Sequence, residues 1–234
     1  MARSFGQYCG VSTALELVGE RWALLIVRDL LVGPRRYTDL KQGLPRVPTN
    51  ILSARLRELQ DAGIVRRVAL AHCGLVYELT PYGRELEDVV LALGRWGFKA
   101  MGAPEDGDVV TIDSLTMALR TAFRPDAARA LPDTAYELHV GDVALLATVA
   151  NGALAVRPVA NARPVDLVAA TGEAREPQLV IAAGPRIRDV IAGTLAPDAA
   201  IDEGAVHVLA GEAALLERFA ATFHLDPEVA ERAS

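Results

Sequence analysis

Residues 37–79 have the sequence YTDLKQGLPRVPTNILSARLRELQDAGIVRRVALAHCGLVYEL, and this stretch decides the fold of the first part of the chain. A short helical pattern occupies 37–42, and the breaker-rich run Gly43-Leu-Pro-Arg-Val-Pro48 ends it. A longer helix is predicted to begin at Thr49, whose hydroxyl suits an N-cap because it can accept a hydrogen bond from the first turn.

This longer helix has one apolar face and one polar face. Its leucines recur at spacings of four and three residues, which places Leu52, Leu56 and Leu59 in a single stripe. The opposite face then carries Asn50, Ser53, Ala54 and Arg57. Such a helix packs against a core and presents hydrogen-bonding groups outward.

Two strand-like runs follow the helix. Gly63 is expected to end it in the left-handed conformation, and 64–70 and 75–79 have the composition of strands joined by the tetrapeptide 71–74. The order of helix, turn, helix and hairpin predicts a winged helix–turn–helix.

Working outward, helical patterns flank this motif on both sides. Ser12–Val18 is a short helix with Ser12 as a possible N-cap. Arg21–Val32 is a stronger one, and its predicted core face consists of Trp22, Leu25, Ile26, Asp29 and Leu30. Thr80-Pro81 begins another helix that extends to about Trp96. Its apolar face is longer than a small domain needs, which suggests dimer contacts alongside the first helix.

The chain is long enough for one large or two ordinary domains, and its charge is distributed unevenly. The chain has 234 residues and a net charge of -6, but residues 1–100 carry fourteen Lys and Arg against ten Asp and Glu, and the remainder carries ten against twenty. A net +4 half joined to a net -10 half suggests that only the first part meets a polyanion. Without a long apolar run or a signal-peptide pattern, the protein is expected to be cytoplasmic, with no membrane partner.

The polar run Pro104–Asp108 predicts a boundary between domains at 1–103 and 109–234. After a helix at 112–123 and a loop at 124–133, a period of two predicts three antiparallel strands at 136–140, 143–149 and 154–157, with Asn151-Gly152 as a hairpin turn. Further strands are predicted at 165–170, 179–183 and 206–209, and helices at 185–195 and 212–223. The fold class is therefore α+β, with an antiparallel sheet in the second domain.

The first half resembles the HxlR-type winged-helix regulators. The matching segments are Cys9–Trp22, Leu25–Tyr37, Leu52–Leu59, Ala62–Val65 and Tyr77–Thr80, with Gly83, in the order and spacing of that family. Gly10 stands where proline is common, and Asn50 where a basic residue is frequent. The resemblance implies a homodimeric transcription factor with a recognition helix in the major groove.

The second half is similar, more loosely, to sterol carrier protein type 2 domains. The residues that carry this likeness are Tyr136–Val140, Asn151-Gly152, Ile191–Pro197 and Gly204–Gly211, with Leu215, Leu216 and Phe219. The resemblance implies a hydrophobic tunnel that holds lipids or other apolar molecules, so a small hydrophobic ligand is an expected partner.

Candidate DNA contacts fall into two groups. On the outer face of the second helix, Thr49, Asn50, Ser53 and Arg57 have the groups that bond base edges, since Asn pairs with adenine and Arg with guanine. Phosphate contacts are assigned to the remaining basic residues, each of which could instead be an ordinary solvated side chain: Arg35, Arg36, Lys41, Arg46, Arg66 and Arg67. Arg55, near the leucine stripe, is as compatible with a structural salt bridge as with a DNA contact.

Cys9 has two interpretations. It precedes a predicted helix start, where a thiolate is favoured, and some HxlR-type regulators sense oxidants or electrophiles with a cysteine at this place. The alternative is a small hydrophobic residue buried at the dimer interface. No catalytic or metal-ligand motif is present, and His72, His139, His207 and His224 suit surface or packing positions, so neither an enzyme nor a metal or cofactor site is predicted.

Three hypotheses follow. The leading one is a transcriptional regulator that binds operator DNA and is controlled by an apolar ligand in its second domain. The alternative is a redox-sensing repressor that acts through Cys9, with a purely structural second domain. A lipid carrier with a vestigial DNA module is a third reading, which the charge distribution disfavours.

Overall fold

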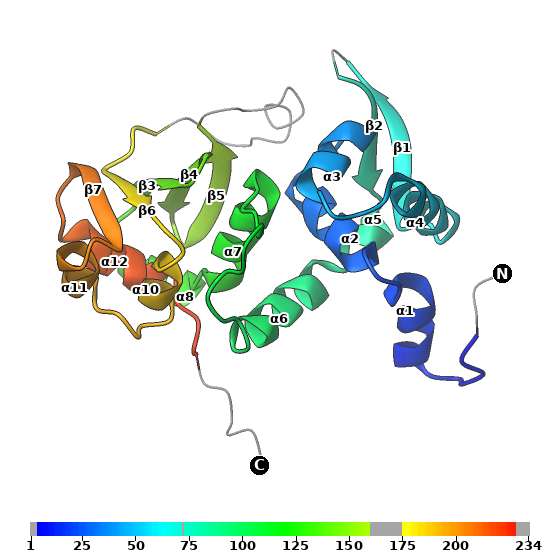
Figure 1. Cartoon of the computed structure of the whole chain (residues 1–234), viewed down its shortest axis with the longest axis horizontal. Coiled ribbons are helices and arrows are strands. Elements are labelled where there is room, and N and C mark those ends of the chain that lie inside the picture. Colours follow the sequence, from blue (N-terminus) through cyan, green and yellow to red (C-terminus); the bar gives the residue numbers. More distant parts are fainter. Residues whose placement is uncertain (1–3, 72, 160–174, 228–234) are drawn as a thin grey trace. The chain divides into compact units, whose positions relative to one another are not determined.

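The computed structural model describes residues 4–71, 73–159 and 175–227. These residues form two compact units, one ending at Val90 and the other beginning at Leu91 (Figure 1). The division falls within a helix, earlier in the chain than the boundary predicted at 104–108, and the domain limits 1–103 and 109–234 stay predictions. No helix in the described ranges combines the length and apolar character needed to cross a membrane.

The first unit has the predicted winged-helix order of elements. Its helices and strands are α1 (Gly10–Val18), α2 (Ala23–Val32), α3 (Tyr37–Gly43), α4 (Thr49–Asp61), β1 (Val65–Leu70), β2 (Gly74–Leu79) and α5 (Pro81–Arg84). The strands pair antiparallel, with Val65 opposite Leu79 and Leu70 opposite Gly74. The helix–turn–helix and its wing are therefore confirmed to within a residue or two at each end.

The core of this unit forms beneath α4. Leu52, Leu56 and Leu59 are each about fully buried, as the stripe predicted, and α4 packs against α1, α2 and β1. Gly63 follows the helix with φ +70°, which confirms the left-handed residue expected there. The apolar stripe thus fixes which face of α4 turns inward.

Several helix starts differ from the predictions. Thr49 is the first helical residue of α4 rather than its N-cap, because Pro48 occupies the cap with extended backbone angles. In the same way α1 begins at Gly10 with Cys9 as its N-cap, so Ser12 lies inside the helix. The helix after Thr80 is broken into α5 and α6 (Glu87–Phe98), although Thr80 does cap α5 by accepting a hydrogen bond from the Gly83 N–H at 3.1 Å.

The second unit contains a five-stranded sheet and helices. Its elements after α6 are α7 (Ile112–Ala122), α8 (Pro125–Ala130), β3 (Thr134–Val140), β4 (Val143–Ala150), β5 (Ala153–Pro158), β6 (Leu179–Ala183), α10 (Ile187–Ile191), α11 (Pro197–Asp202), β7 (Val206–Gly211) and α12 (Leu215–Thr222). The strand order is β5-β4-β3-β6-β7. The predicted α+β class and the three strands 136–140, 143–149 and 154–157 are confirmed.

The prediction that the whole sheet is antiparallel is wrong. β3 pairs parallel with β6, with Tyr136 opposite Leu179, while the β3–β4, β4–β5 and β6–β7 pairs are antiparallel. Hydrophobic alternation gives the faces of a strand but not its direction. A parallel neighbour needs a long connection, and β6 begins about twenty residues after β5 ends.

Local signals explain one hairpin turn and miss two helices. Asn151 and Gly152 have φ of +53° and +73°, as the predicted Asn-Gly hairpin requires. α8 lies in the expected loop 124–133, and α11 follows a helix α10 that is shorter than the predicted 185–195. The predicted strand 165–170 and His72 lie outside the described residues.

One face of the sheet carries the core. Alternate residues of β3 and β4, including Tyr136, Leu138 and Leu145, pack with Phe219 of α12 and with Phe223, which directly follows that helix. Figure 1 shows α8, α10, α11 and α12 gathered on the same side of the sheet. This unit is therefore a helical layer on a mixed sheet, and its core is rich in aromatic rings.

Candidate nucleic-acid interface

The outer face of α4 presents the predicted set of hydrogen-bonding side chains. Thr49, Asn50, Ser53 and Arg57 are all exposed, whereas the leucines at intervening positions are buried. Asn50, Ser53 and Arg57 are spaced by three and four residues, so they follow one line along the helix. The face consequently holds an amide, a hydroxyl and a guanidinium in a row, starting in the first helical turn.

A hydroxyl contact connects this face to α3. The Tyr37 hydroxyl donates to the Thr49 carbonyl at 2.9 Å, and the Ser53 hydroxyl lies 3.2 Å from the Tyr37 oxygen. Tyr37 was not among the predicted site residues. Its position as the first residue of α3 gives no sequence signal for this role, because the contact depends on how α3 and α4 cross.

Lys41 supports the turn between the two helices. Its ammonium donates to the carbonyls of Pro45 and Val47 at 2.9 Å and 2.8 Å. Two of its three hydrogens therefore stabilise the connection that precedes α4. The structure thus gives Lys41 a structural role beside its predicted phosphate contact.

The remaining cations of the unit lie in different settings. Arg46 is exposed in the turn before α4, and Arg36 is half-buried at the start of α3, where its backbone N–H donates to the Asp39 carboxylate. In the wing, Arg66 pairs across the strands with Glu78 at 2.6 Å, and the Arg67 guanidinium lies 5.9 Å from the centre of the Tyr77 ring. Both wing arginines are exposed on β1.

Arg35 is a correction to the predicted phosphate contacts. Its side chain has no exposed surface, and it is the largest of the fully buried side chains. The backbone of Arg35 exchanges two hydrogen bonds with Tyr77 of the wing, and its guanidinium donates to the Pro34 carbonyl at 2.8 Å. A phosphate cannot reach a guanidinium enclosed in this way, so Arg35 supports the junction between α2, α3 and the wing.

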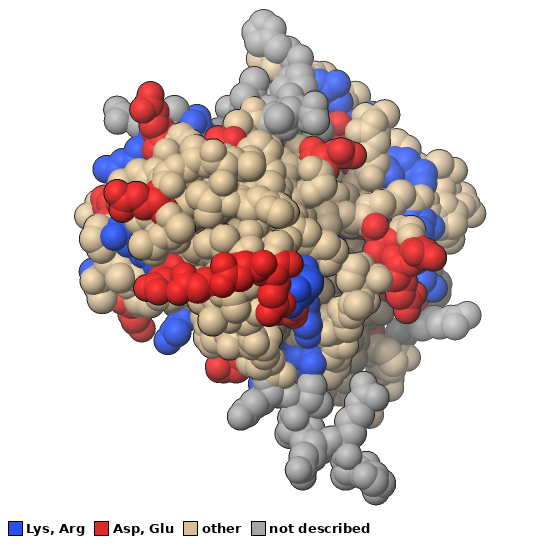
Figure 2. Space-filling model, turned by 60° about the vertical axis from the view of Figure 1, so that its left-hand side comes forward, with Lys and Arg blue, Asp and Glu red and all other residues tan. Residues whose placement is uncertain are grey.

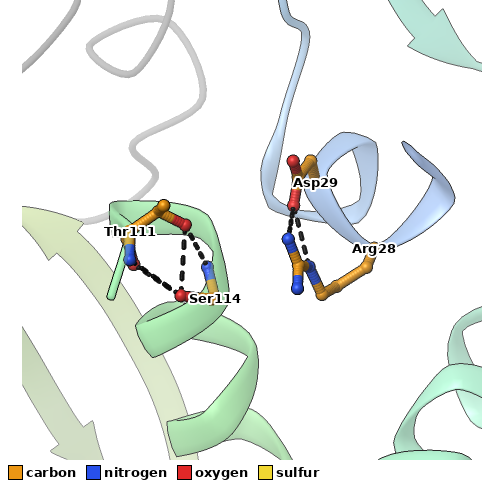
Figure 3. A network of polar contacts seen from close by, with 4 residues as sticks. All are labelled: Arg28, Asp29, Thr111 and Ser114. Atoms are coloured by element: carbon orange, nitrogen blue, oxygen red, sulfur yellow. Dashed lines mark hydrogen bonds and ion pairs between the residues drawn. The ribbon is translucent and has the colours of Figure 1, made fainter. Parts of the chain in front are cut away.

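Ion pairs account for two further charged residues. Arg55 contacts Glu58 one turn along α4 and Glu20 at 3.6 Å, which supports the structural interpretation of that side chain. Asp29 is fully buried on α2, and the Arg28 guanidinium holds one of its carboxylate oxygens at 2.7 Å and 2.8 Å (Figure 3). A buried carboxylate needs such compensation, because transfer from water disfavours its charged form.

Cys9 occupies the N-cap of α1 and is exposed. The backbone N–H of Ser12, then that of Val11, and then the Ser12 side chain stabilise the thiolate, and together they lower the pKa of Cys9 below its ordinary value. In this chain by itself Cys9 is thus accessible rather than buried. Cys73, in contrast, is buried against Val76 in the wing.

The second unit has polar groups that serve its own structure. Thr111 and Ser114 form a capping box at the start of α7, each hydroxyl accepting a hydrogen bond from the other residue's backbone N–H (Figure 3). His139 lies 2.7 Å from Glu137, and His224 lies 3.3 Å from Asp226. Within the described ranges, no group of three or more His, Cys, Asp and Glu residues has an arrangement suited to a metal ion.

Burial also alters one phenol in that unit. Tyr136 is fully buried, its ring lies edge-on to Phe219 at 5.4 Å between centroids, and desolvation raises its pKa above the ordinary value. In Figure 2, where the side of this unit comes forward, the acidic residues form separate groups on a largely uncharged surface, which agrees with a solvated exterior.

Comparison with known proteins identifies relatives of the first part of the chain. A family model described as HxlR-like helix-turn-helix matches residues 17–105. An HTH-type transcriptional regulator of Mycobacterium tuberculosis is 41% identical over 100 residues, which are 41% of this chain and 61% of that relative. The HTH-type transcriptional regulator YdeP of Bacillus subtilis is 31% identical over 93 residues, which are 39% of this chain and 73% of that relative.

Among solved structures, the redox regulator HypR in its oxidized form is 31% identical, with 38% of this chain and 94% of that chain covered and a TM-score of 0.36. The matches to YdeP and to the mycobacterial regulator cover about two fifths of this chain, and the chain spans 61% of the length of the mycobacterial relative. The residues of α4 and the wing all lie inside the segment that the family model matches.

Proposed function

This chain belongs to the HxlR-like helix-turn-helix family, and on that premise we propose that it is a homodimeric transcriptional regulator that binds double-stranded operator DNA through α4. One observation carries the proposal: α4 buries its leucine stripe and exposes Asn50, Ser53 and Arg57 in a line from its N-terminal turn. A recognition helix contacts base edges with residues of this kind near its N-terminus.

The exposed cations of the same unit suit the phosphates that flank such a groove. Arg46 precedes α4 and Arg66 and Arg67 lie on the wing, so the helix has basic residues before and after it in the chain. Phosphate contacts add affinity without sequence information. The acidic second half repels a polyanion, which favours an approach of DNA to the first unit.

A selection experiment tests this proposal. The full chain is incubated with a randomised duplex library, and bound duplexes are amplified over several rounds. The affinity of the chain for the most enriched duplex is then measured at several salt concentrations. A homodimer should select two inverted half-sites about one helical turn apart, with an affinity that falls steeply with salt. If no sequence is enriched and binding does not depend on salt, DNA recognition by this chain is refuted.

For residues 109–234 we propose a sterol-carrier-like domain that binds a small apolar molecule and changes the DNA affinity of the dimer. The support is the resemblance of this region to such domains, together with an apolar core in which the rings of Tyr136, Phe219 and Phe223 lie on the helix-covered face of a sheet. A ligand can only act through a difference in its affinity for the two states. Native mass spectrometry of the freshly purified chain should show a bound apolar molecule, and a chain that is unliganded after gentle purification and unaffected by added lipids would contradict ligand control.

The position of Cys9 supports a second candidate, a redox-sensing or electrophile-sensing repressor with a structural second domain. An exposed thiol with a lowered pKa at a helix N-cap has the accessibility and thiolate character that oxidants require. The selected duplex provides the assay. Binding by the wild type should fall after treatment with diamide and recover with dithiothreitol, and an unchanged response in Cys9→Ser would remove this candidate.

A further inference from the structure

The contact between α3 and α4 fixes where one hydroxyl hydrogen lies. Tyr37 has a single hydroxyl hydrogen, and its oxygen is 2.9 Å from the Thr49 carbonyl oxygen. A carbonyl accepts hydrogen bonds and cannot donate them. The hydrogen of Tyr37 is therefore committed to Thr49.

This commitment determines the orientation of Ser53. The Ser53 oxygen is 3.2 Å from the Tyr37 oxygen, and a hydrogen must lie between them for a bond to form. Because Tyr37 has already used its own hydrogen, Ser53 must supply the hydrogen for this second bond. The Ser53 oxygen then has only lone pairs left for a partner outside the protein.

Ser53 is placed where such a partner would be a base. It is exposed, and it lies between Asn50 and Arg57 on the outer line of α4. In the major groove, adenine and cytosine present an amino donor, whereas guanine and thymine present only acceptors and a methyl group. A free serine hydroxyl can form a hydrogen bond with either kind of base. A serine hydroxyl that can only accept a hydrogen bond can pair with adenine or cytosine alone, because only these two bases present an amino donor.

We propose that Tyr37 makes Ser53 an obligate hydrogen-bond acceptor toward DNA, so that Ser53 selects adenine or cytosine over guanine or thymine at one position of each half-site. This inference rests on the proposed function of α4. Tyr37 acts as a positioning residue, since it holds the Ser53 hydroxyl and the first turn of the recognition helix without needing to touch DNA.

The test compares full-length variants in the duplex selection. Ser53→Ala identifies the base position that Ser53 contacts, because the preference at that position alone should disappear. In the wild type, replacing a selected adenine by purine, which lacks the exocyclic amino group, should weaken binding roughly 2- to 10-fold, the factor expected for one net hydrogen bond. Where cytosine is selected, its replacement by 2-pyrimidinone, which lacks the 4-amino group, serves the same purpose.

Tyr37→Phe separates the role of the tyrosine from that of the serine. Removing one oxygen frees the Ser53 hydrogen to donate, so discrimination against guanine and thymine at that position should fall by the same factor while overall affinity stays within about twofold. Tyr82→Phe removes an exposed phenol from α5 and is the matched control, with an unchanged preference expected.

The outcomes distinguish this inference from the function on which it rests. If the wild type selects an operator but prefers guanine or thymine at the Ser53 position, the acceptor assignment is overturned. If Tyr37→Phe keeps the full preference, the tyrosine has no part in it. If the wild type selects no operator at all, the proposed function fails first and the inference fails with it.

Discussion

At the scale of single residues, identical side chains have different roles because their surroundings differ. Arg35 and Arg46 lie eleven residues apart, yet one is fully enclosed and the other exposed. Cys9 and Cys73 differ in the same way, the first exposed at a helix N-cap and the second buried in the wing. Residue type alone therefore does not decide which arginine can reach a phosphate or which thiol can react.

The two arginines give a prediction that separates stability from DNA affinity. Arg35→Ala should lower the free energy of unfolding by about 3 kcal/mol or more, because it leaves a cavity and unsatisfied buried partners. Arg46→Ala should change the free energy of unfolding by less than about 0.5 kcal/mol. It should lower the slope of the logarithm of the duplex binding constant against the logarithm of the salt concentration by about one, since one phosphate contact is lost. Urea denaturation and binding isotherms measure these effects, and equal destabilisation by both changes would contradict the assignment.

The pH dependence of alkylation tests the environment of Cys9. Its pKa is lowered, so a larger share of the thiol is ionised near neutral pH, and the rate of its reaction with iodoacetamide should reach half its maximum at a lower pH than for an unperturbed thiol. Cys73→Ser isolates the reaction of Cys9, and Cys9→Ser provides the slow background of the buried thiol. A half-maximal pH equal to that of a cysteine in a denatured chain would contradict the stabilising N–H contacts.

At the scale of elements, close backbone contacts hold the wing and the short helix α5 together. A Cβ added at Gly83 would lie 2.1 Å from the Ile64 carbonyl oxygen, which is backbone and cannot move aside easily. The Thr80 hydroxyl donates to the Gly63 carbonyl at 2.6 Å and accepts from the Gly83 N–H. The end of α4, the wing and α5 are thus joined through atoms that leave no room for a side chain.

Substitution of two helical glycines provides a matched comparison. Gly83→Ala should destabilise the chain by about 2 kcal/mol or more, since the methyl group overlaps a backbone carbonyl. Gly97→Ala, in α6 where the added Cβ would meet nothing within 4 Å beyond the adjoining residues and backbone of its own helix, should be neutral or stabilising by about 0.5–1 kcal/mol. Thermal and urea unfolding of the two variants would show whether the contact at Gly83 is as tight as the geometry requires.

At the scale of the whole molecule, the exposed apolar faces of α1 and α6 support the proposed homodimer. Val89, Leu93 and Trp96 are spaced by four and three residues on α6, and Trp96 is 73% exposed. Val11 and Leu15 form a similar exposed pair on α1. Large apolar side chains aligned along a helix commonly mark an interaction surface.

Introducing a charge on α6 tests this surface. Leu93→Glu should convert the dimer to a monomer in sedimentation equilibrium and weaken binding to a two-half-site duplex by at least tenfold, because the second half-site is no longer held in register. Arg95→Glu also adds a carboxylate to α6, about 160° away around the helix, and should leave the dimer intact. If Leu93→Glu remains a dimer, the dimer interface does not lie on this face of α6.

Local sequence patterns were sufficient to predict the order of elements in the first unit and the inward face of α4. Leucine spacing, the breakers at 43–48 and the position of Gly63 fixed α4 and the wing, because periodicity and turn residues are local properties of the chain. The same signals predicted β3, β4 and β5 and the Asn151-Gly152 turn. They also identified Asn50, Ser53 and Arg57 as the outer face of α4.

Features that depend on distant segments meeting in space could not be predicted from these patterns. The parallel β3–β6 pair, the enclosure of Arg35 and the contact of Tyr37 with Thr49 and Ser53 each join residues from different elements. Local patterns contain no information on strand direction or on how two helices cross. Long-range packing alone therefore settled which cations remain exposed and which way the Ser53 hydroxyl points.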